Sequence, residues 1–355
     1  MSKNVVHIVG TGTIGEPLIS LFCTFQKQLG IDEVTFAKKS ATLTDRSKVQ
    51  ALINHGAKLA ADDESAKSFQ AIGIKPTYTI DEALTQASVV IDCTPVGNQN
   101  KAELYEKYLH NTKGFIAQGS EFGFGKMYAR GINDETLVVG KDKFIQVVSC
   151  NTHNLAILVK TIGMNSGKAP QEFDSARFVC IRRANDISQD KSFIPGLQVG
   201  KHDDAQYGTH HAHDAHELFK TKGMDLKLFS SSIKTNTQYM HTVWFHIKTK
   251  QPITKKEVLQ RLYDNDLVSI THKSSSNTVF SFGRDHGHYG RILNQTVIAE
   301  ATVEVVDGNN IYGWCFTPQD GNSLLSSVAA TAFFLYPDSY SEKIQCLKPY
   351  FFNEV

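Results

Sequence analysis

A glycine-rich turn between a strand and a helix constrains the fold of this chain more than any other feature. Residues Val5–Val9 read as a buried strand, and Gly10-Thr-Gly-Thr-Ile-Gly15 leads from it into an apolar helical pattern. In that context Gly10 permits the tight turn, Gly12 lets a pyrophosphate approach the backbone, and Gly15 allows close packing of helix on strand. The motif predicts a dinucleotide-binding unit. A tight turn that binds no ligand is the alternative.

Short apolar strands alternate with helical patterns through residues 1–149. After the first strand, strand patterns fall at 34–36, 89–93, 115–117 and 144–148, and helical patterns fall near 16–28, 45–55, 81–87 and 100–109. Such alternation is typical of parallel sheets whose crossover connections are helices. This part of the chain is therefore predicted to be α/β, with a Rossmann-type, doubly wound parallel sheet.

The rest of the sequence has longer strand patterns, in which apolar and polar residues alternate and β-branched and aromatic residues are frequent. They fall at 177–181, 240–248, 278–282, 297–306 and 311–316, with a helical pattern at 255–263. The Asp-Gly-Asn-Asn turn at 307–310 favours a hairpin between the last two strands. We therefore expect an α+β catalytic domain with a mainly antiparallel sheet.

These patterns place a domain boundary at residue 150. We expect an NAD(P)-binding domain at 1–149 and a catalytic, substrate-binding domain at 150–323. An apolar helix at 324–335, ended by Pro337, is expected to return to the first domain, so that residues of about 324–355 complete it. Ligand sites are commonly built where domains meet.

Composition argues against several other classes of function. The 37 basic and 36 acidic residues nearly balance, which gives no electrostatic basis for binding nucleic acid or an anionic membrane. No apolar run has the length of a membrane span, and the first residues lack a signal-peptide pattern. The six cysteines are far apart, without a C-x-x-C spacing, as is typical of reduced thiols. We expect a cytoplasmic protein.

Cys150 stands where a predicted strand passes into a predicted helix, within Ser149-Cys-Asn-Thr152. The backbone N–H groups and the dipole at a helix N-terminus favour the thiolate, and they can hold an oxyanion formed beside the sulfur. The pattern therefore predicts a nucleophile that is ionised at neutral pH. The alternative is a buried, inert cysteine.

The end of the second predicted strand bears on the choice of cofactor. A carboxylate there would bind the ribose 2′-hydroxyl of NAD, but this strand ends in Lys38 and Lys39. Two lysines suggest the 2′-phosphate of NADP, with NAD also possible. Solvated surface lysines are the alternative.

A cysteine beside a nicotinamide suggests oxidation of an aldehyde through a thioester that phosphate or another acceptor then takes. Such chemistry needs a base and cationic groups for an anionic substrate. The Arg182–Arg183 pair offers phosphate ligands, and one of the two arginines could be simple surface charge. His241 and His246 offer a base, although either could be a core histidine.

A histidine-rich segment at 209–216 is a further candidate. His213 and His216 could share a helical face and bind a metal, but no thiolate or carboxylate pair completes a ligand set. We therefore predict no metal site and expect a loop that faces the substrate phosphate.

Taken together, these residues resemble the type II (archaeal-type) phosphorylating glyceraldehyde-3-phosphate dehydrogenases over nearly the whole chain. The longest matching block is Gly-Lys-Asp-x-x-x-Val-Val-Ser-Cys-Asn-Thr, at 140–152. Other motifs of the family match the glycine turn at 10–15 and segments at 93–95, 100–105, 118–121, 182–186, 210–214, 237–241 and 283–287.

The resemblance implies roles for particular residues. Cys150 is similar to the family's nucleophile and His241 to its general base. Substrate contacts are implied at Ser149, Asn151, Arg182, His210 and His211. Cofactor contacts are implied at Gly10, Gly12, Thr13, Ile14, Gly15, Lys38, Lys39, Thr94, Pro95, Gly119, Ser120, Arg183 and Gln319.

The implied reaction is the reversible, NADP- or NAD-dependent phosphorylating oxidation of glyceraldehyde 3-phosphate to 1,3-bisphosphoglycerate, through a thiohemiacetal and a thioester on Cys150. The implied partners are the aldehyde and inorganic phosphate, and the implied assembly is a homotetramer or homodimer. The sequence departs from the family at His153-Asn154, at Ala212, at Asn236 and in the loop at 192–196. These departures keep open a semialdehyde dehydrogenase or an acyl-CoA reductase with the same covalent mechanism. A catalytically silent cofactor-binding protein is a third interpretation.

Overall fold

The structure, a computed structural model, describes residues 3–119, 121–189, 193–318 and 320–355. The chain forms two compact units. The first comprises residues 1–126, 137–147 and 326–348, and the second comprises residues 127–136, 148–325 and 349–355. Segments 127–136 and 349–355 thus belong to the second unit, whereas the sequence patterns assigned them to the first. The domain limits expected from the sequence remain a prediction.

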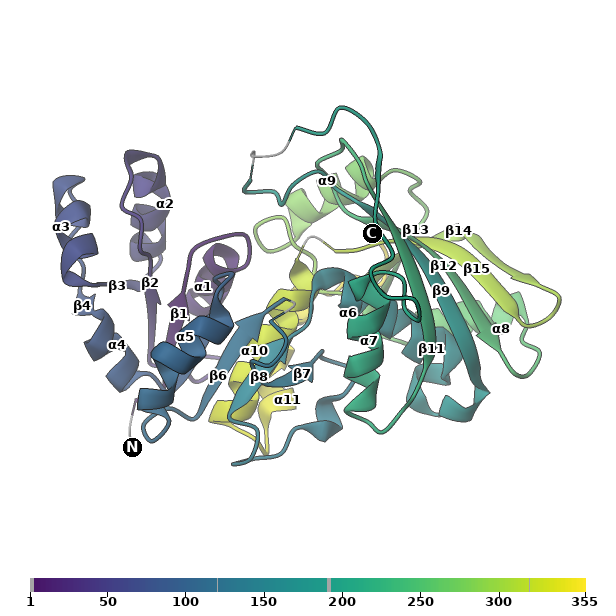
Figure 1. Ribbon diagram of the computed structural model, residues 1–355, viewed down its shortest axis with the longest axis horizontal. Coiled ribbons are helices and arrows are strands. Elements are labelled where there is room, and N and C mark those ends of the chain that lie inside the picture. The colour runs from purple at the N-terminus through teal and green to yellow at the C-terminus, as the bar shows by residue number, and fades with distance from the viewer. Residues whose placement is uncertain (1–2, 120, 190–192, 319) are drawn as a thin grey trace. The chain divides into compact units, whose positions relative to one another are not determined.

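The first unit contains an eight-stranded sheet in the order β4-β3-β2-β1-β5-β6-β8-β7 (Figure 1). Strand β1 pairs in parallel with β2 on one side and β5 on the other, and β5, β6 and β8 continue in parallel. The strands are β1 (Val5–Val9), β2 (Glu33–Ala37), β3 (Lys58–Ala61), β4 (Tyr78–Thr79), β5 (Val89–Asp92), β6 (Gly114–Gln118), β7 (Lys126–Tyr128) and β8 (Phe144–Val147). The predicted Rossmann-type parallel sheet is confirmed.

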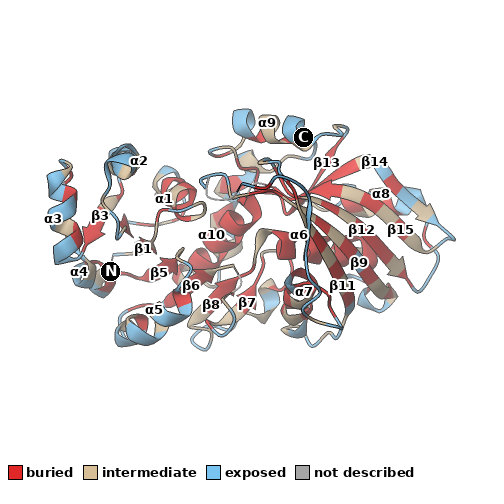
Figure 2. Cartoon of the chain, turned by 45° about the horizontal axis from the view of Figure 1, so that its top comes forward, coloured by how far each residue is buried: buried red, intermediate tan, exposed pale blue. Residues whose placement is uncertain are grey.

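Helices connect these strands, as expected of parallel crossovers. They are α1 (Gly15–Thr24), α2 (Leu43–Asn54), α3 (Asp63–Ala71), α4 (Ile80–Gln86) and α5 (Gly97–Glu103). Side chains cap three of them: Thr42, Asp62 and Thr79 each accept a backbone N–H of the first turn. The strands are largely buried, while α2 and α3 keep exposed faces (Figure 2).

The segment 326–348 packs on the sheet of the first unit. It contains the end of α10 (Gly321–Leu335) and α11 (Tyr340–Lys343). A Cβ at Gly114 would lie 2.2 Å from the Phe334 ring, so glycine is required on β6 for this close packing. The Tyr336 hydroxyl also donates to the Gly30 carbonyl at 2.6 Å.

The second unit contains a seven-stranded sheet in the order β10-β11-β9-β12-β15-β14-β13. The pairs β10–β11, β9–β12, β12–β15 and β15–β14 are antiparallel, and β9–β11 and β13–β14 are parallel. The strands are β9 (Phe173–Arg182), β10 (Gln198–Val199), β11 (Lys227–Lys234), β12 (Thr242–Thr249), β13 (Val268–Thr271), β14 (Thr296–Val306) and β15 (Asn310–Phe316). The expectation of a mainly antiparallel sheet is confirmed.

One strand prediction is wrong. Residues 278–282 lie inside helix α9 (Ser276–His286), although Thr-Val-Phe-Ser-Phe has strand composition. The buried positions of the helix are Val279 and Gly283, while Ser281 between them is only partly buried, which fits the helical period and not the strand period of two. The Ser275 hydroxyl accepts the Asn277 N–H and caps the helix. Local capping and helical burial therefore outweigh the β-branched and aromatic composition.

Apolar side chains are buried on both faces of the sheet in the second unit, because Ile298 of β14 belongs to the larger buried cluster and its neighbours Val297 and Ala299 belong to a second one. On β12, Val243, Phe245 and Ile247 are fully buried and alternate with more polar positions. Helix α7 (His210–Lys220) packs against β11, and α8 (Lys255–Tyr263) packs against β13 and β14. Helix α6 (Cys150–Leu158) is buried at every position after Cys150.

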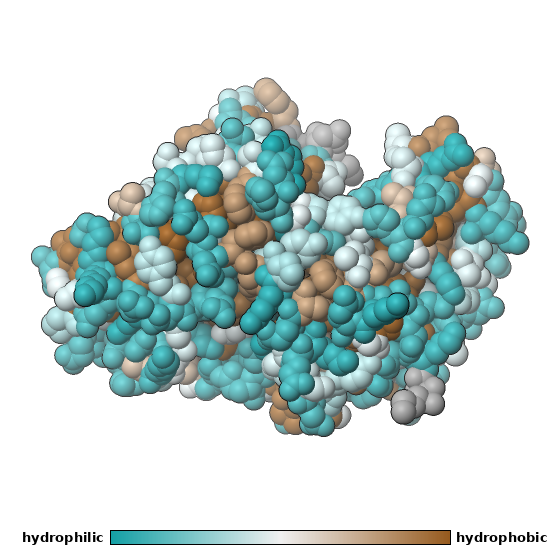
Figure 3. All heavy atoms as spheres, turned by 180° about the vertical axis from the view of Figure 1, so that it is seen from behind, coloured by the Kyte–Doolittle hydropathy of each residue, from teal (hydrophilic) through white to brown (hydrophobic). Residues whose placement is uncertain are grey.

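None of the helices in the described ranges has both the length and the apolar composition of a membrane-spanning segment. Hydrophilic side chains cover most of the face shown in Figure 3.

Candidate active site

Cys150 is the first residue of α6, and the preceding strand β8 ends three residues before it. The Ser149 hydroxyl accepts the Thr152 N–H at 3.3 Å and caps the helix. The Cys150 carbonyl accepts a hydrogen bond from the Asn322 amide at 2.9 Å. The predicted place of the thiol at a strand-to-helix junction is confirmed. Contact of Ser149 with substrate stays a prediction, and its hydroxyl acts as the helix cap here.

The expected ionisation of the Cys150 thiol at neutral pH gains no support from its surroundings and stays a prediction. Burial raises the pKa of the Cys150 thiol to about 12, and the negative charge of Asp320 adds to this shift. The Arg183 charge and the Asn151 backbone N–H act in the opposite direction but do not outweigh burial.

The pKa of Cys150 predicts how the free chain reacts with iodoacetamide. A thiol with a pKa of about 12 is protonated at pH 7, and its thiolate fraction rises about tenfold per pH unit below the pKa. The alkylation rate at Cys150, followed by peptide mass spectrometry, should therefore rise about tenfold per unit from pH 7 to pH 9. A rate that levels off below pH 8 would contradict the raised pKa.

Arg183 is buried beside the cysteine and is paired with carboxylates. Its guanidinium contacts Asp186 at 2.9 Å and Asp320 at 3.2 Å. Burial lowers the pKa of Arg183, but the negative charges around it, chiefly those of Asp320 and Asp186, outweigh burial and raise it above the ordinary value. The Arg183 Nε has no hydrogen-bond partner among the described residues. The cofactor contact predicted for Arg183 stays a prediction. Its guanidinium is already paired with Asp186 and Asp320.

Asp320 is a residue of the site that the sequence patterns missed. It precedes α10, has a left-handed backbone (φ 55°), and is 5% exposed. Burial raises the pKa of Asp320, and the charges of Arg183 and Arg291 oppose the shift. Only the fold brings Asp320 to Arg183, because 137 residues separate them in sequence.

His241 lies immediately before β12 and is held by the backbone of Arg183. Its Nδ1 accepts the Arg183 N–H at 3.0 Å, so the neutral ring carries its proton on Nε2. Burial, with the charges of Arg183 and Arg182, holds the pKa of His241 well below its usual value. The ring is therefore neutral at pH 7 and donates through Nε2. The predicted role as general base stays a prediction, and it requires exchange to the other tautomer.

Two other histidines, His211 and His153, already hold hydrogen bonds to Asn151 and Ser149. His211 Nε2 faces the Asn151 amide nitrogen at 3.3 Å, and its Nδ1 faces the Thr209 hydroxyl at 3.1 Å. Burial, with the charges of His210 and Arg182, holds the pKa of His211 well below its usual value. His153 Nδ1 donates to the Ser149 carbonyl at 2.9 Å, and burial lowers the pKa of His153 to about 4.

Arg182 and His210 line a cavity of about 320 Å³ in the second unit. The other lining residues are Gly200, Lys201, Asp203, Asp204, Gly208, Thr209, His213 and Ser232. Burial and the Arg182 charge lower the pKa of His210, while Asp203 opposes them. The structure thus brings two predicted substrate ligands to one cavity, together with a lysine and two aspartates.

The remaining histidines of the 209–216 segment have structural contacts. The Tyr207 ring packs against both His213 and His216, and His216 Nδ1 bonds to the Leu226 carbonyl at 3.0 Å. Within the described ranges, no group of three or more His, Cys, Asp or Glu side chains is arranged to hold a metal ion.

The glycine turn of the first unit fits a dinucleotide. Gly10 has φ 95°, and a Cβ at Gly15 would lie 2.1 Å from the Gly10 carbonyl oxygen, so both positions require glycine. A Cβ at Gly12 would meet nothing within 4 Å, which leaves open space where a pyrophosphate would approach.

Three loops meet at the carboxyl ends of neighbouring strands in this sheet. The glycine turn follows β1, Thr94 and Pro95 follow β5, and Gly119 follows β6. The strand order reverses between β1 and β5, which is where open α/β sheets bind ligands. The structure thus brings together the cofactor residues predicted in this unit, which stay predictions as contacts. Ser120 and Gln319, also predicted cofactor ligands, lie outside the described residues.

Lys38 and Lys39 follow β2, the strand next to β1. The Lys38 ammonium group lies 3.2 Å from the Asp45 carboxylate and 3.0 Å from the Ser40 hydroxyl. Lys39 is exposed. A 2′-phosphate at this position would have to compete with Asp45 for Lys38.

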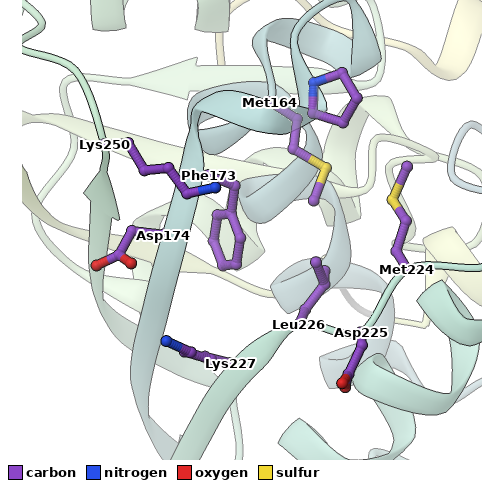
Figure 4. Close-up of a pocket in the computed structure, with 9 residues that line it drawn as sticks. Met164, Phe173, Asp174, Met224, Asp225, Leu226, Lys227 and Lys250 are labelled. Carbon is purple, nitrogen blue, oxygen red and sulfur yellow. The ribbon is translucent and has the colours of Figure 1, made fainter.

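Figure 4 shows another hollow in the second unit, with a volume of about 320 Å³. Its lining combines apolar side chains with two lysines and two aspartates: Met164, Pro170, Phe173, Asp174, Met224, Asp225, Leu226, Lys227 and Lys250. None of these is a predicted substrate or cofactor residue, so the hollow is not part of the site.

The Rossmann-type sheet and the relatives of the chain imply a nicotinamide-dependent dehydrogenase. Curated proteins named glyceraldehyde-3-phosphate dehydrogenase are similar to the chain: one from Saccharolobus islandicus is 30% identical over 72% of this chain and 70% of its own length. One from Sulfolobus acidocaldarius is 26% identical over 88% of this chain and 86% of its own length. One from Methanobrevibacter smithii is 23% identical over 95% of this chain and 96% of its own length. No protein-family model matches. The chain belongs to the archaeal glyceraldehyde-3-phosphate dehydrogenase family.

Proposed function

We propose that this protein carries out the reversible phosphorylating oxidation of glyceraldehyde 3-phosphate, with Cys150 as the nucleophile. One observation carries the proposal. In this chain, a member of the family, the thiol at the N-terminus of α6 lies close enough to the Arg183 guanidinium to feel its charge. The backbone N–H of Arg183 also holds the neutral His241 ring. Nucleophile, cation and acid–base group are thus linked through one residue.

The addition step follows from the protonation states. When the Cys150 sulfur bonds to the aldehyde carbon, the thiol proton passes to the carbonyl oxygen, so no net charge has to be created. The Nε2–H of His241 can donate to that oxygen and stabilise the partial negative charge that it carries before the thiol proton arrives. This route suits a thiol whose pKa is about 12, because a preformed thiolate is not required.

The oxidation step needs a base for the hydroxyl proton of the thiohemiacetal. A bound nicotinamide cofactor supplies the acceptor for the hydride. His241 is proposed to take the proton at Nε2, after tautomer exchange moves the ring hydrogen to Nδ1 and gives up the bond from the Arg183 N–H. The acyl group then remains on Cys150 as a thioester until phosphate takes it and the thiol is restored.

The phosphate group of the substrate is proposed to enter the cavity lined by Arg182 and His210. Arginine binds phosphate oxygens in a bidentate manner, and Lys201 adds a second cation to the same lining. Asp203 and Asp204 lie in that lining too, and they would oppose a dianionic group. This observation favours a second candidate, the same chemistry on a less charged aldehyde, as in semialdehyde dehydrogenases.

A panel of aldehydes tests the proposal. Each aldehyde is assayed with NADP and NAD, with and without phosphate and with and without coenzyme A. Phosphate-dependent oxidation of glyceraldehyde 3-phosphate is the expected result. Dependence on coenzyme A, or activity with a semialdehyde only, would favour the second candidate.

We also propose that Lys38 and Lys39 bind the 2′-phosphate of NADP. A hydrogen bond to a charged group contributes about 1.5–3 kcal/mol, so Lys38→Ala with Lys39→Ala should weaken NADP binding about 10- to 100-fold and leave NAD binding nearly unchanged. Titration of intrinsic fluorescence with each cofactor measures both constants. Lys107→Ala with Lys113→Ala, at two other exposed lysines, is the matched control. Equal weakening of NADP and NAD would refute the assignment.

A further inference from the structure

A chain of buried hydrogen bonds joins Asn151, the neighbour of Cys150, to Thr317, the residue after β15. The Thr317 hydroxyl donates to the Asn151 side-chain oxygen at 3.0 Å. The Asn154 amide nitrogen donates to the same hydroxyl at 2.8 Å. Asn151 is 3% exposed and Thr317 is 2% exposed, so water does not compete for these bonds.

The donors and acceptors in this chain have fixed directions. An amide nitrogen can only donate, so Asn154 uses the acceptor side of the Thr317 hydroxyl and the single hydroxyl proton goes to Asn151. The Cys315 thiol lies 3.4 Å from the Asn154 oxygen and 3.7 Å from the Val243 carbonyl, and its one hydrogen can go to either acceptor. Asn154 is one of the residues that depart from the family pattern.

The other side of Asn151 is fixed in the same way. Its amide nitrogen donates to His211 Nε2 at 3.3 Å, and His211 must then hold its proton on Nδ1 and donate to Thr209 at 3.1 Å. The Thr209 and Ser230 hydroxyls follow, 2.6 Å apart. Because His211 stays neutral, its Nε2 remains an acceptor at neutral pH.

Asn151 is therefore held at its oxygen by Thr317 and at its nitrogen by His211. The amide nitrogen has a second hydrogen, and its only hydrogen bond within the described part of the chain is the one to His211. The backbone N–H of the same residue interacts with the Cys150 sulfur. A carbonyl oxygen bonded to carbon beside that sulfur would find an oriented donor here.

We propose that Thr317 is a positioning residue for the reaction at Cys150. Its hydroxyl fixes the orientation of the Asn151 carboxamide, so that the second amide hydrogen is presented to the oxygen of the aldehyde. This inference rests on the proposed function. Thr317 also donates its backbone N–H to the His241 carbonyl at 2.9 Å, so one residue aligns both groups that would meet the substrate oxygen.

Loss of the Thr317 hydroxyl should lower kcat more than it raises KM. Without that donor, the Asn151 amide can turn over and present its oxygen to the developing negative charge. Removal of one oxyanion donor costs about 10²–10³-fold in kcat, and loss of its orientation should cost about 10- to 100-fold. This donor acts mainly on the charge that develops in the transition state and contributes little to binding of the substrate itself. KM should therefore change less than about threefold.

The test compares Thr317→Val, which keeps the shape but removes the hydroxyl, with Thr317→Ser, which keeps the hydroxyl. Thr249→Val is the matched control, because the Thr249 hydroxyl is as deeply buried but bonds to loop carbonyls. For each full-length variant, kcat, KM, the thermal midpoint and the alkylation rate of Cys150 are measured. The expected result is a lower kcat in Thr317→Val, near-normal kcat in Thr317→Ser and Thr249→Val, and an unchanged alkylation rate.

Several results would overturn the inference: wild-type kcat in Thr317→Val, a serine variant as slow as the valine variant, or an equal loss of kcat in Thr249→Val. If Thr317→Val does not fold, Asn154→Ala provides the test, because it removes the donor that orients the Thr317 hydroxyl. An unchanged kcat in Asn154→Ala would then overturn the inference. Absence of aldehyde oxidation in the wild-type protein would overturn the proposed function itself. An active wild type beside a fully active valine variant overturns the inference alone.

Discussion

Replacing Cys150 with serine should abolish NADP reduction by the aldehyde and leave cofactor binding intact. A serine hydroxyl has a much higher pKa than a thiol and is a weaker nucleophile without an adjacent base, so we expect kcat to fall by more than about 10⁴-fold. The cofactor residues proposed in the first unit do not include Cys150, so the affinity for NADP should change little. Steady-state absorbance at saturating substrate, together with cofactor titration, measures both quantities.

The control for this prediction is Cys346→Ser. Cys346 is a free, partly exposed cysteine whose thiol contacts the Lys343 carbonyl and belongs to no proposed site. Its variant should keep wild-type activity. If Cys150→Ser retained more than a few per cent of the activity, another residue would have to be the nucleophile, and the proposed mechanism would fail.

Replacing His241 with asparagine should lower kcat by about 10²–10⁴-fold, the usual contribution of a positioned acid–base group. The neutral imidazole is held by the Arg183 N–H, and asparagine cannot reproduce both its donor at Nε2 and its later role as a base. The thermal midpoint should fall by only a few degrees, because one hydrogen bond to a backbone amide contributes about 1 kcal/mol. Stopped-flow absorbance at saturating substrate measures the loss.

His246→Asn provides the matched control for His241. Both histidines are 9% exposed, but His246 bonds to the Asn310 side chain within the sheet and belongs to no proposed site. Its variant should keep kcat within about twofold, as expected for a substitution away from the chemistry. A loss below tenfold in His241→Asn would transfer the acid–base role elsewhere. His153 and His211 are poor substitutes, because each already bonds to Ser149 or Asn151.

Local sequence signals predicted most of the fold. The glycine turn and the strand–helix alternation gave the parallel sheet, because each crossover leaves its own pattern of buried and exposed residues. Residues 278–282 were misread as a strand, because Val and Phe are compatible with either element and the cap at Ser275 decides. Strand β11 was also missed, since its serine-rich sequence is buried by packing against β9 and not marked by composition.

The site was harder to predict, because its energetics depend on contacts between distant segments. The position of Cys150 could be read from its neighbours, but its pKa depends on burial and on Asp320, 170 residues further along. The pairing of Arg183 with Asp320 leaves no local signal either. The tautomer of His241 follows from one backbone N–H that only the folded chain brings to it.

The central claim is that the Cys150 sulfur forms a covalent bond to the aldehyde carbon, and it can be tested by mass spectrometry. The wild-type protein is mixed with glyceraldehyde 3-phosphate and NADP in phosphate-free buffer, quenched in acid and mapped by peptides. We expect one acyl group on the peptide that contains Cys150, in amounts matching a burst of NADPH, and its discharge when phosphate is added. A burst of NADPH with an unmodified Cys150, or with the acyl group on another residue, would contradict the account.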